Sequence, residues 1–369
     1  MYKRLSYLPG LAILAVVLNH AGGWGYVAMV WWAHRYRDVV VPAYDQIFQP
    51  GNIALDAVHN LTIFAVGAFL FVSGFFIAYT ARGNESRVGW KTIRPRIVNL
   101  LIPYVIWSIF VFLLDAFFGD IYTPGNYLLK FFLIGANGGY FFVPVLVMFY
   151  LISPWIVDLA KKNARLLIII ALLIQLLPIA LRYIRLFFPD LSFVNALINL
   201  TPDQLIFRWA LYFPLGVVFS VKMNDVKQWL QKYRSWVLTT LILSFLLYTI
   251  EAELVIYSTP DHWKPGPSSI FFLTYTVSLI SAFLAFEELK IPYASQLTKL
   301  GGRSYGIYLV HFEIMTIAAK LIYHFLPQLL SSRALLTLVL FAIGLGGSLL
   351  VIWFVQKTPL SRFYRYLFG

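Results

Sequence analysis

Cysteine is absent from this chain of 369 residues, and charged residues make up only 12% of it. The first absence excludes disulfides, thiolate nucleophiles and cysteine-ligated metals. The second excludes an ordinary soluble domain, in which about a quarter of the residues are charged. Hydrophobic residues account for 60% of the chain, more than the core of a soluble protein of this length requires. The composition therefore predicts an integral membrane protein.

Ten apolar segments are each close to the ~20 residues with which an α-helix crosses a bilayer. They lie at about 5–21, 58–80, 98–118, 140–160, 166–182, 204–221, 236–251, 268–286, 304–325 and 334–355. Two shorter apolar stretches, 26–33 and 127–136, are interpreted as interfacial or re-entrant pieces. The predicted fold is an all-α, polytopic transmembrane bundle of about ten helices. It forms a single domain over residues 1–369, with no appended soluble domain, because the longest polar stretches have only loop length.

The basic residues predict the orientation. With a cytoplasmic N-terminus and ten alternating helices, 20 of the 29 Lys and Arg residues fall on the cytoplasmic side. Cytoplasmic loops collect such residues, so both termini are predicted to be cytoplasmic. The formal charge of +13 then reflects topology, and no nucleic-acid partner is expected. Contact with anionic lipid heads or with a polyphosphate donor stays open as the other reading.

Five short motifs occur in order along nearly the whole chain. They are an apolar run from Gly10 to His20, a Ser-Gly-Phe segment within 69–77, a basic turn running into Pro-Tyr at 96–104, an aromatic element at 140–146, and a Ser-Tyr-x-Ile-Tyr-x-x-His run that ends at His311. Together they resemble the membrane acyltransferase-3 family. The resemblance implies about ten helices in a bacterial cell membrane. It also implies transfer of an acyl group, such as acetyl or succinyl, from cytosolic acyl-CoA to a hydroxyl of an extracytoplasmic carbohydrate.

Two positions depart from the family pattern. Pro9 stands where the first helix usually has Arg, and Asn99 stands where the third helix usually has the second Arg of Arg-x-x-Arg. Acyl-CoA is the expected donor, and no tightly bound cofactor is expected. Both departures concern donor binding.

His20 is the predicted catalytic residue. Acyl transfer needs a base for the hydroxyl proton, and histidine has a suitable pKa near neutrality. The end of the first span at about residue 21 would place His20 at the outer membrane surface, where a glycan arrives. An interfacial histidine bonded to a loop carbonyl is the structural alternative.

The remaining candidates divide between the two substrates. Asp56 and His59 are assigned to acceptor binding. A carboxylate three residues before a histidine on a helix can orient the imidazole ring. The alternative is that both residues belong to a solvated helix start. Ser73 is a further substrate candidate, or a close-packing point beside Gly74. No third metal ligand accompanies these residues, so no metal site is predicted. Donor binding is assigned to four residues near the cytoplasmic ends of helices: Arg94, Arg96, Arg303 and His311.

Two other functions remain possible from the sequence. Ten helices also suit an exporter of a polysaccharide or lipid-linked glycan, although the two halves show no internal symmetry of the kind many transporters have. Pro9 and Asn99 favour a third reading, a catalytically degenerate partner in a polysaccharide synthesis complex.

The topology can be tested with reporter fusions at Asn84 and Gly266. The distribution of basic residues predicts that Asn84 is cytoplasmic and Gly266 extracytoplasmic. Alkaline phosphatase should be active only at Gly266, and a cytoplasmic fluorescent reporter only at Asn84. The same side for both would overturn the ten-span arrangement.

Overall fold

The computed structural model describes residues 2–27, 50–81, 88–201, 205–258 and 266–369, and every regular element in these ranges is a helix. Within the described ranges, seven stretches are long and apolar enough to cross a membrane. They are Leu8–Gly25, Ile53–Thr80, Trp90–Phe117, Phe142–Phe187, Arg234–Val255, Ser304–Phe325 and Arg333–Lys357. The predicted all-helical, multi-pass membrane fold is confirmed.

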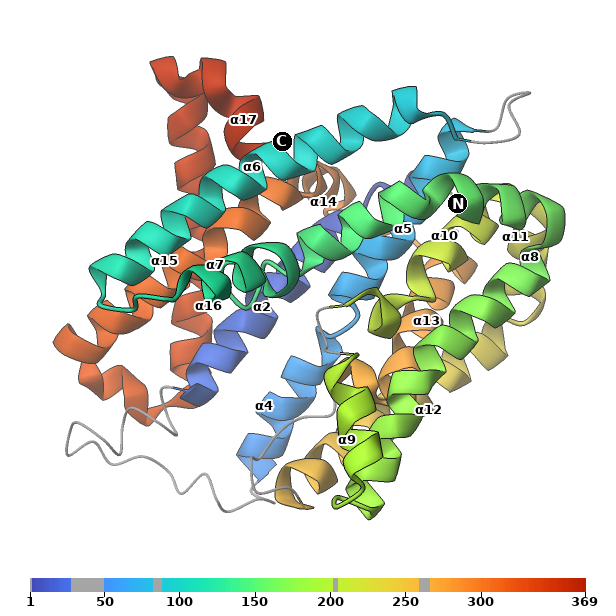
Figure 1. Cartoon of the computed structure of the whole chain (residues 1–369), viewed down its shortest axis with the longest axis horizontal. Coiled ribbons are helices and arrows are strands. Elements are labelled where there is room, and N and C mark those ends of the chain that lie inside the picture. Colours follow the sequence, from blue (N-terminus) through green and yellow to red (C-terminus); the bar gives the residue numbers. More distant parts are fainter. Residues whose placement is uncertain (1, 28–49, 82–87, 202–204, 259–265) are drawn as a thin grey trace.

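The longer helices form the bundle drawn in Figure 1. They are α2 (Leu8–Val27), α4 (Pro50–Leu61), α5 (Ala65–Thr80), α6 (Trp90–Phe117), α8 (Phe142–Phe187), α10 (Tyr212–Val221), α12 (Arg234–Ser258), α13 (Ile270–Ala285), α15 (Ser304–Phe325) and α16 (Arg333–Lys357). Short helices cover the ends of the bundle: α1 (Tyr2–Leu5), α7 (Pro124–Leu129), α9 (Ser192–Asn199), α11 (Met223–Lys232), α14 (Ala294–Gly301) and α17 (Tyr364–Phe368).

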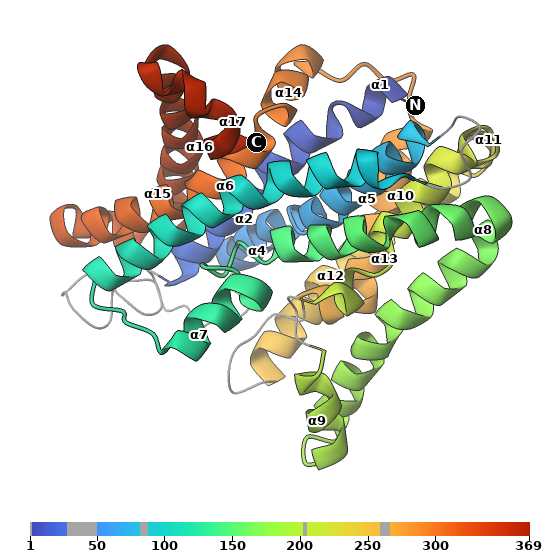
Figure 2. The same cartoon turned by 45° about the horizontal axis from the view of Figure 1, so that its top comes forward.

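The helix α8 contains two predicted spans. Asn163 has non-helical backbone angles of φ −151° and ψ 85°, and the 46-residue element bends there. Figure 2 shows the two arms of α8 diverging from this corner. The helices α10 and α13 are shorter apolar helices, of 10 and 16 residues. The count of ten spans therefore stays a prediction.

Two predicted helix boundaries were wrong. The segment 58–80 is not one helix, because a turn at residues 62–64 separates α4 from α5. The first long helix does not end near residue 21 but continues to Val27. Gly22, Gly23 and Gly25 lie within this helix, since glycine is well tolerated in transmembrane helices, where neighbouring helices cover the backbone. The predicted short segment 26–33 lies largely outside the described residues, and 127–136 forms α7 and a π-helical turn, η2 (Lys130–Ile134).

The two ends of the described chain lie on the same side of the bundle. Near the N-terminus, Arg4 donates to the carbonyl oxygen of Phe286, just after α13, at 2.7 Å. Near the C-terminus, Phe368 of α17 packs against Gly306 at the start of α15. Figure 2 shows α1, α14 and α17 together at this end, which the basic residues predict to be cytoplasmic.

The centre of the bundle depends on direct backbone contact between α5 and α10. A Cβ atom on Gly74 would overlap the carbonyl oxygen of Phe213, and one on Gly216 would overlap the carbonyl oxygen of Phe71. Small residues allow such close approach of transmembrane helices. Gly74 is therefore a packing residue, and its neighbour Ser73 is held beside this contact.

Gly74→Ala should lower the stability of the protein. The added methyl group meets rigid backbone, so the helices must separate, at a cost of about 1–3 kcal/mol. The measurement is thermal unfolding in detergent. Gly346→Ala is the matched control, because Gly346 lies on α16 and its Cβ would meet no atom within 4 Å. Equal melting temperatures for Gly74→Ala and wild type would refute the packing role.

Candidate active site

A cavity of about 460 Å³ lies inside the helical bundle. One part of its lining comes from the end that carries both termini and includes Leu100, Ser304 and Tyr305. Another part includes Gly266, which precedes the start of α13. Phe286, which contacts Arg4 near the N-terminus, follows the other end of α13, so Gly266 lies at the end of the bundle away from the termini. The cavity therefore has lining residues from both ends of the bundle. Aromatic side chains form much of its wall: Phe69, Phe141, Phe142, Tyr150, Trp209, Tyr248, Phe272, Tyr305 and Tyr308.

His20 lines this cavity from within the membrane span. The helix α2 continues for seven residues beyond His20, or about 10 Å at 1.5 Å per residue. His20 is therefore not at the end of the first long helix, as expected, but about two turns before it.

His311 lies against His20. Its Nε2 is 3.1 Å from His20 Nδ1, and its Nδ1 is 2.9 Å from the carbonyl oxygen of Ile307. The carbonyl can only accept, so Nδ1 of His311 carries the proton in this contact. With both rings neutral, the form that an apolar interior favours, Nε2 of His311 accepts and Nδ1 of His20 donates. The lone pair of His20 is then on Nε2.

His311 therefore lies behind His20, and its assignment to donor binding stays a prediction. It is 1% exposed and is not among the residues that line the cavity. The spacing of the late motif identified the residue but could not show which way its ring points on α15. Its contact with His20 brings the first and last motifs of the chain together.

A glycine-rich loop at 135–139 covers the other side of His20. A Cβ atom on Gly139 would lie 3.0 Å from Cε1 of His20. Asn137 holds the loop: its Oδ1 accepts from the Gly139 amide at 3.0 Å, and its Nδ2 donates to Glu313 at 2.7 Å. Tyr308 donates to the Gly139 carbonyl oxygen at 2.6 Å. Sequence reasoning missed Asn137, for which the chain offers no motif.

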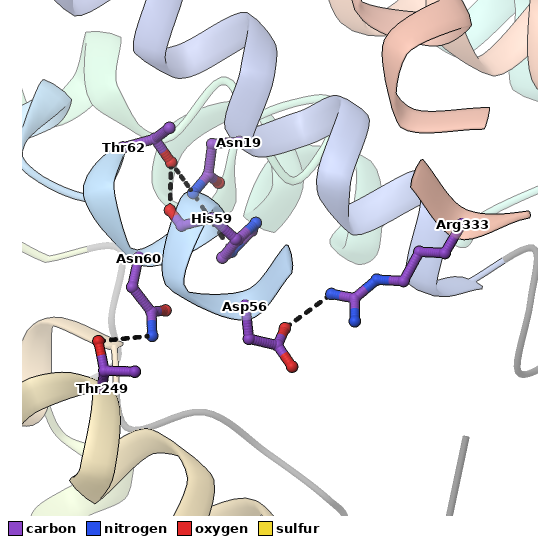
Figure 3. Close-up of polar contacts among 7 residues, drawn as sticks. All are labelled: Asn19, Asp56, His59, Asn60, Thr62, Thr249 and Arg333. Carbon is purple, nitrogen blue, oxygen red and sulfur yellow. Dashed lines mark hydrogen bonds and ion pairs between the residues drawn. The ribbon is translucent and has the colours of Figure 1, made fainter. Parts of the chain in front are cut away.

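A second polar group lines the cavity next to His20. Asn19 donates from Nδ2 to the hydroxyl of Thr62 at 2.8 Å and lies 3.3 Å from Nε2 of His59 (Figure 3). All three residues line the cavity. His59 is near the C-terminal end of α4, just before the turn that separates α4 from α5, and not at a helix start as predicted. The helix break thus brings polar groups to the cavity wall.

Asp56 forms a buried ion pair with Arg333 of α16. Its Oδ1 is 2.7 Å from Nη2 of Arg333, the first residue of α16, and the two side chains are only 12% and 7% exposed. Figure 3 shows the Asp56 carboxylate directed toward Arg333. Asp56 is not among the residues that line the cavity. The sequence analysis did not single out Arg333. An arginine at the start of an apolar helix gives no local sign of a partner that is distant in the sequence.

Ser73 lines the cavity, as its assignment to a substrate requires. Arg303 directly precedes Ser304, which lines the cavity at the predicted cytoplasmic end. Arg96 and Arg94 lie on α6, two residues apart, and so point about 200° away from each other. Arg94 shares its face with the exposed Val98. Arg96 shares its face with Asn99 and Leu100, so it is better placed than Arg94 for a ligand at this end.

Comparison with known proteins identifies the family. A family model described as an acyltransferase domain matches residues 2–356. The chain belongs to the acyltransferase-3 family. In the described residues no three His, Cys, Asp or Glu side chains gather as a metal site would require.

Relatives of this acyltransferase-3 chain occur in Staphylococcus aureus. Proteins of strains MRSA252 and MSSA476, each named "Probable poly-beta-1,6-N-acetyl-D-glucosamine export protein", are 20% identical to it over 260 and 263 residues. The matches cover 69% of this chain and 69% of each relative. No solved structure matches.

The buried ion pair should stabilise the fold. Asp56→Ala and Arg333→Ala each leave one charge buried without its partner, which typically costs about 3–5 kcal/mol. Unfolding in detergent, followed by helical circular dichroism, measures the loss. The double variant should lose much less than the sum of the two single losses. Additive losses would show that the two residues act independently.

Proposed function

We propose that this protein is an integral membrane O-acyltransferase that moves an acyl group from cytosolic acyl-CoA to a hydroxyl of an extracytoplasmic carbohydrate. The observation that carries the proposal is the hydrogen-bonded pair His20–His311 on the wall of the cavity. Family membership supports acyl transfer as the reaction class. An acetyl or succinyl group suits a cavity of about 460 Å³.

The histidine pair suits general base catalysis. The Ile307 carbonyl fixes the proton on Nδ1 of His311, and His311 in turn orients the His20 ring. The Nε2 atom of His20 is left to accept a proton. A base held in one tautomer by a second group is the arrangement that activates hydroxyl nucleophiles in many acyl-transfer enzymes.

The reaction then proceeds in two steps. The acceptor hydroxyl loses its proton to Nε2 of His20 while its oxygen attacks the thioester carbonyl carbon, which forms a tetrahedral intermediate. The carbon–sulfur bond then breaks, and the proton on His20 passes to the departing sulfur. The products are an ester of the carbohydrate and free CoA. Proton gain and loss at His20 balance over the cycle.

The cavity gives each substrate its own approach. The thioester enters between Leu100, Ser304 and Tyr305, at the end where the termini lie, with the polar part of CoA outside among the basic residues. The acceptor enters from the end of Gly266 and meets Asn19 and His59 before His20. Asn19 and His59 have the hydrogen-bonding groups that recognise a sugar hydroxyl.

Polysaccharide export is the second candidate function. The names of the Staphylococcus aureus relatives favour it. An exporter needs a path for a sugar chain through the membrane, and it needs no acyl donor. Purified protein in liposomes, incubated with radiolabelled acetyl-CoA and a soluble oligomer of N-acetylglucosamine, separates the two functions. Labelled ester on the oligomer supports the transferase, and movement of the oligomer without label supports the exporter.

His20→Ala should abolish most of the transfer. Loss of a general base typically lowers the rate by about 10²–10⁴-fold. The measurement is acyl transfer by the purified variant, with yield and melting temperature recorded beside it. His324→Ala is the control, since His324 is an exposed histidine near the end of α15. Transfer by His20→Ala at the wild-type rate would exclude His20 as the base.

A further inference from the structure

The C-terminal segment brings an arginine to the predicted cytoplasmic mouth of the cavity. Arg365 of α17 donates from Nε and Nη2 to the side-chain oxygen of Asn99, at 3.2 and 2.9 Å. Asn99 is followed by Leu100, which lines the cavity and whose carbonyl oxygen accepts from Tyr305 at 2.6 Å. Tyr305 lines the cavity as well. The guanidinium group is therefore held beside Asn99, which directly precedes one of the residues that line this end of the cavity.

The packing of α17 against neighbouring helices holds Arg365 in this position. Phe368, three residues later, is 4% exposed and lies against Gly306 of α15. The indole nitrogen of Trp107 on α6 donates to the carbonyl oxygen of Leu367 at 2.8 Å. These contacts join α17 to both helices that border the mouth. The position of Arg365 is thus built into the fold.

The guanidinium group of Arg365 is fixed in place by a neutral partner, and its positive charge is not neutralised. Asn99 supplies a neutral amide oxygen, and among the described residues no carboxylate forms an ion pair with Arg365. Its hydrogen bonds to Asn99 use Nε and Nη2, which leaves both N–H groups of Nη1 for a ligand. A guanidinium fixed in place with its full charge is well suited to a phosphate group.

The neighbouring charges have the same sign. Arg96 lies one turn before Asn99 on the same face of α6, and Arg303 directly precedes the cavity residue Ser304. Neither forms an ion pair with a described carboxylate. Three guanidinium groups without carboxylate partners around one opening indicate a polyanionic ligand.

We propose that Arg365 is a donor-binding residue that contacts a phosphate group of acyl-CoA at the cytoplasmic mouth. This inference rests on the proposed function, because it takes acyl-CoA as the donor. It extends the donor site to a segment that follows the residues matched by the family model, which end at 356. Asn99, in this arrangement, is the residue that positions Arg365.

The test is binding of CoA to the full-length protein in nanodiscs of zwitterionic lipid. Arg365→Ala should weaken the affinity for CoA about tenfold or more, the usual effect of losing a hydrogen bond to a charged group. Pantetheine, which has the same thiol arm without phosphates, should bind the variant and wild type equally. Arg362→Ala is the matched control, since Arg362 is an exposed arginine in the same segment and lies over its neighbour Phe363.

The possible results of this binding experiment distinguish the role of Arg365 from the proposed function. Equal CoA affinity for Arg365→Ala and wild type overturns the role of Arg365 and leaves the proposed function standing. Absence of CoA binding to the wild type overturns both. An equal loss for CoA and pantetheine shows that Arg365 supports the fold or a lipid contact instead of a phosphate. Arg365→Gln, which keeps a donor for Asn99, repeats the test without disturbing α17 if the alanine variant is unstable.

Discussion

The hydrogen bond between His20 and His311 is the contact on which the candidate active site depends. A membrane interior offers no bulk water, so a buried imidazole nitrogen must find its partner within the protein. Ile307 supplies one acceptor and His311 the next, which leaves Nε2 of the cavity residue His20 to accept a proton. The same requirement that stabilises the pair also determines which nitrogen can take a proton. The need to pair buried imidazole nitrogens within the protein therefore accounts both for the contact between the two rings and for the nitrogen that can act as a base.

Irregular backbone gathers around the cavity for a related reason. Unwound segments are tolerated at membrane depth where protein covers them or where they line a cavity. The turn between α4 and α5 brings Thr62 to the wall, and the glycine-rich loop at 135–139 brings Gly139 to His20. Around these interruptions, the Gly74 and Gly216 contacts hold α5 and α10 at backbone distance. The close packing of α5 against α10 thus accompanies irregular backbone at the wall of the cavity.

Charged groups are arranged differently at the two ends of the helical bundle. Asp56 and Arg333 neutralise each other in a buried pair, which links α4 to α16. At the end where the termini lie, Arg96, Arg303 and Arg365 have no carboxylate partner among the described residues. A paired charge contributes to the fold, whereas unpaired like charges cost energy that a bound anion recovers. This difference separates residues that hold the helices together from residues that are available to a ligand.

The sequence by itself determined the class of the protein and most of its helices, because the length and apolarity of a span follow directly from the thickness of the bilayer. Its motifs also selected His20 and His311. It did not show that the two histidines touch across 291 positions of the chain, nor that Asn99 receives an arginine from 266 positions away. It also placed the end of α2 too early and read 58–80 as one helix, because glycines and turns covered by neighbouring helices have no distinct local signal. Such contacts depend on how each helix is rotated about its axis, and that rotation is decided by the packing of the whole bundle.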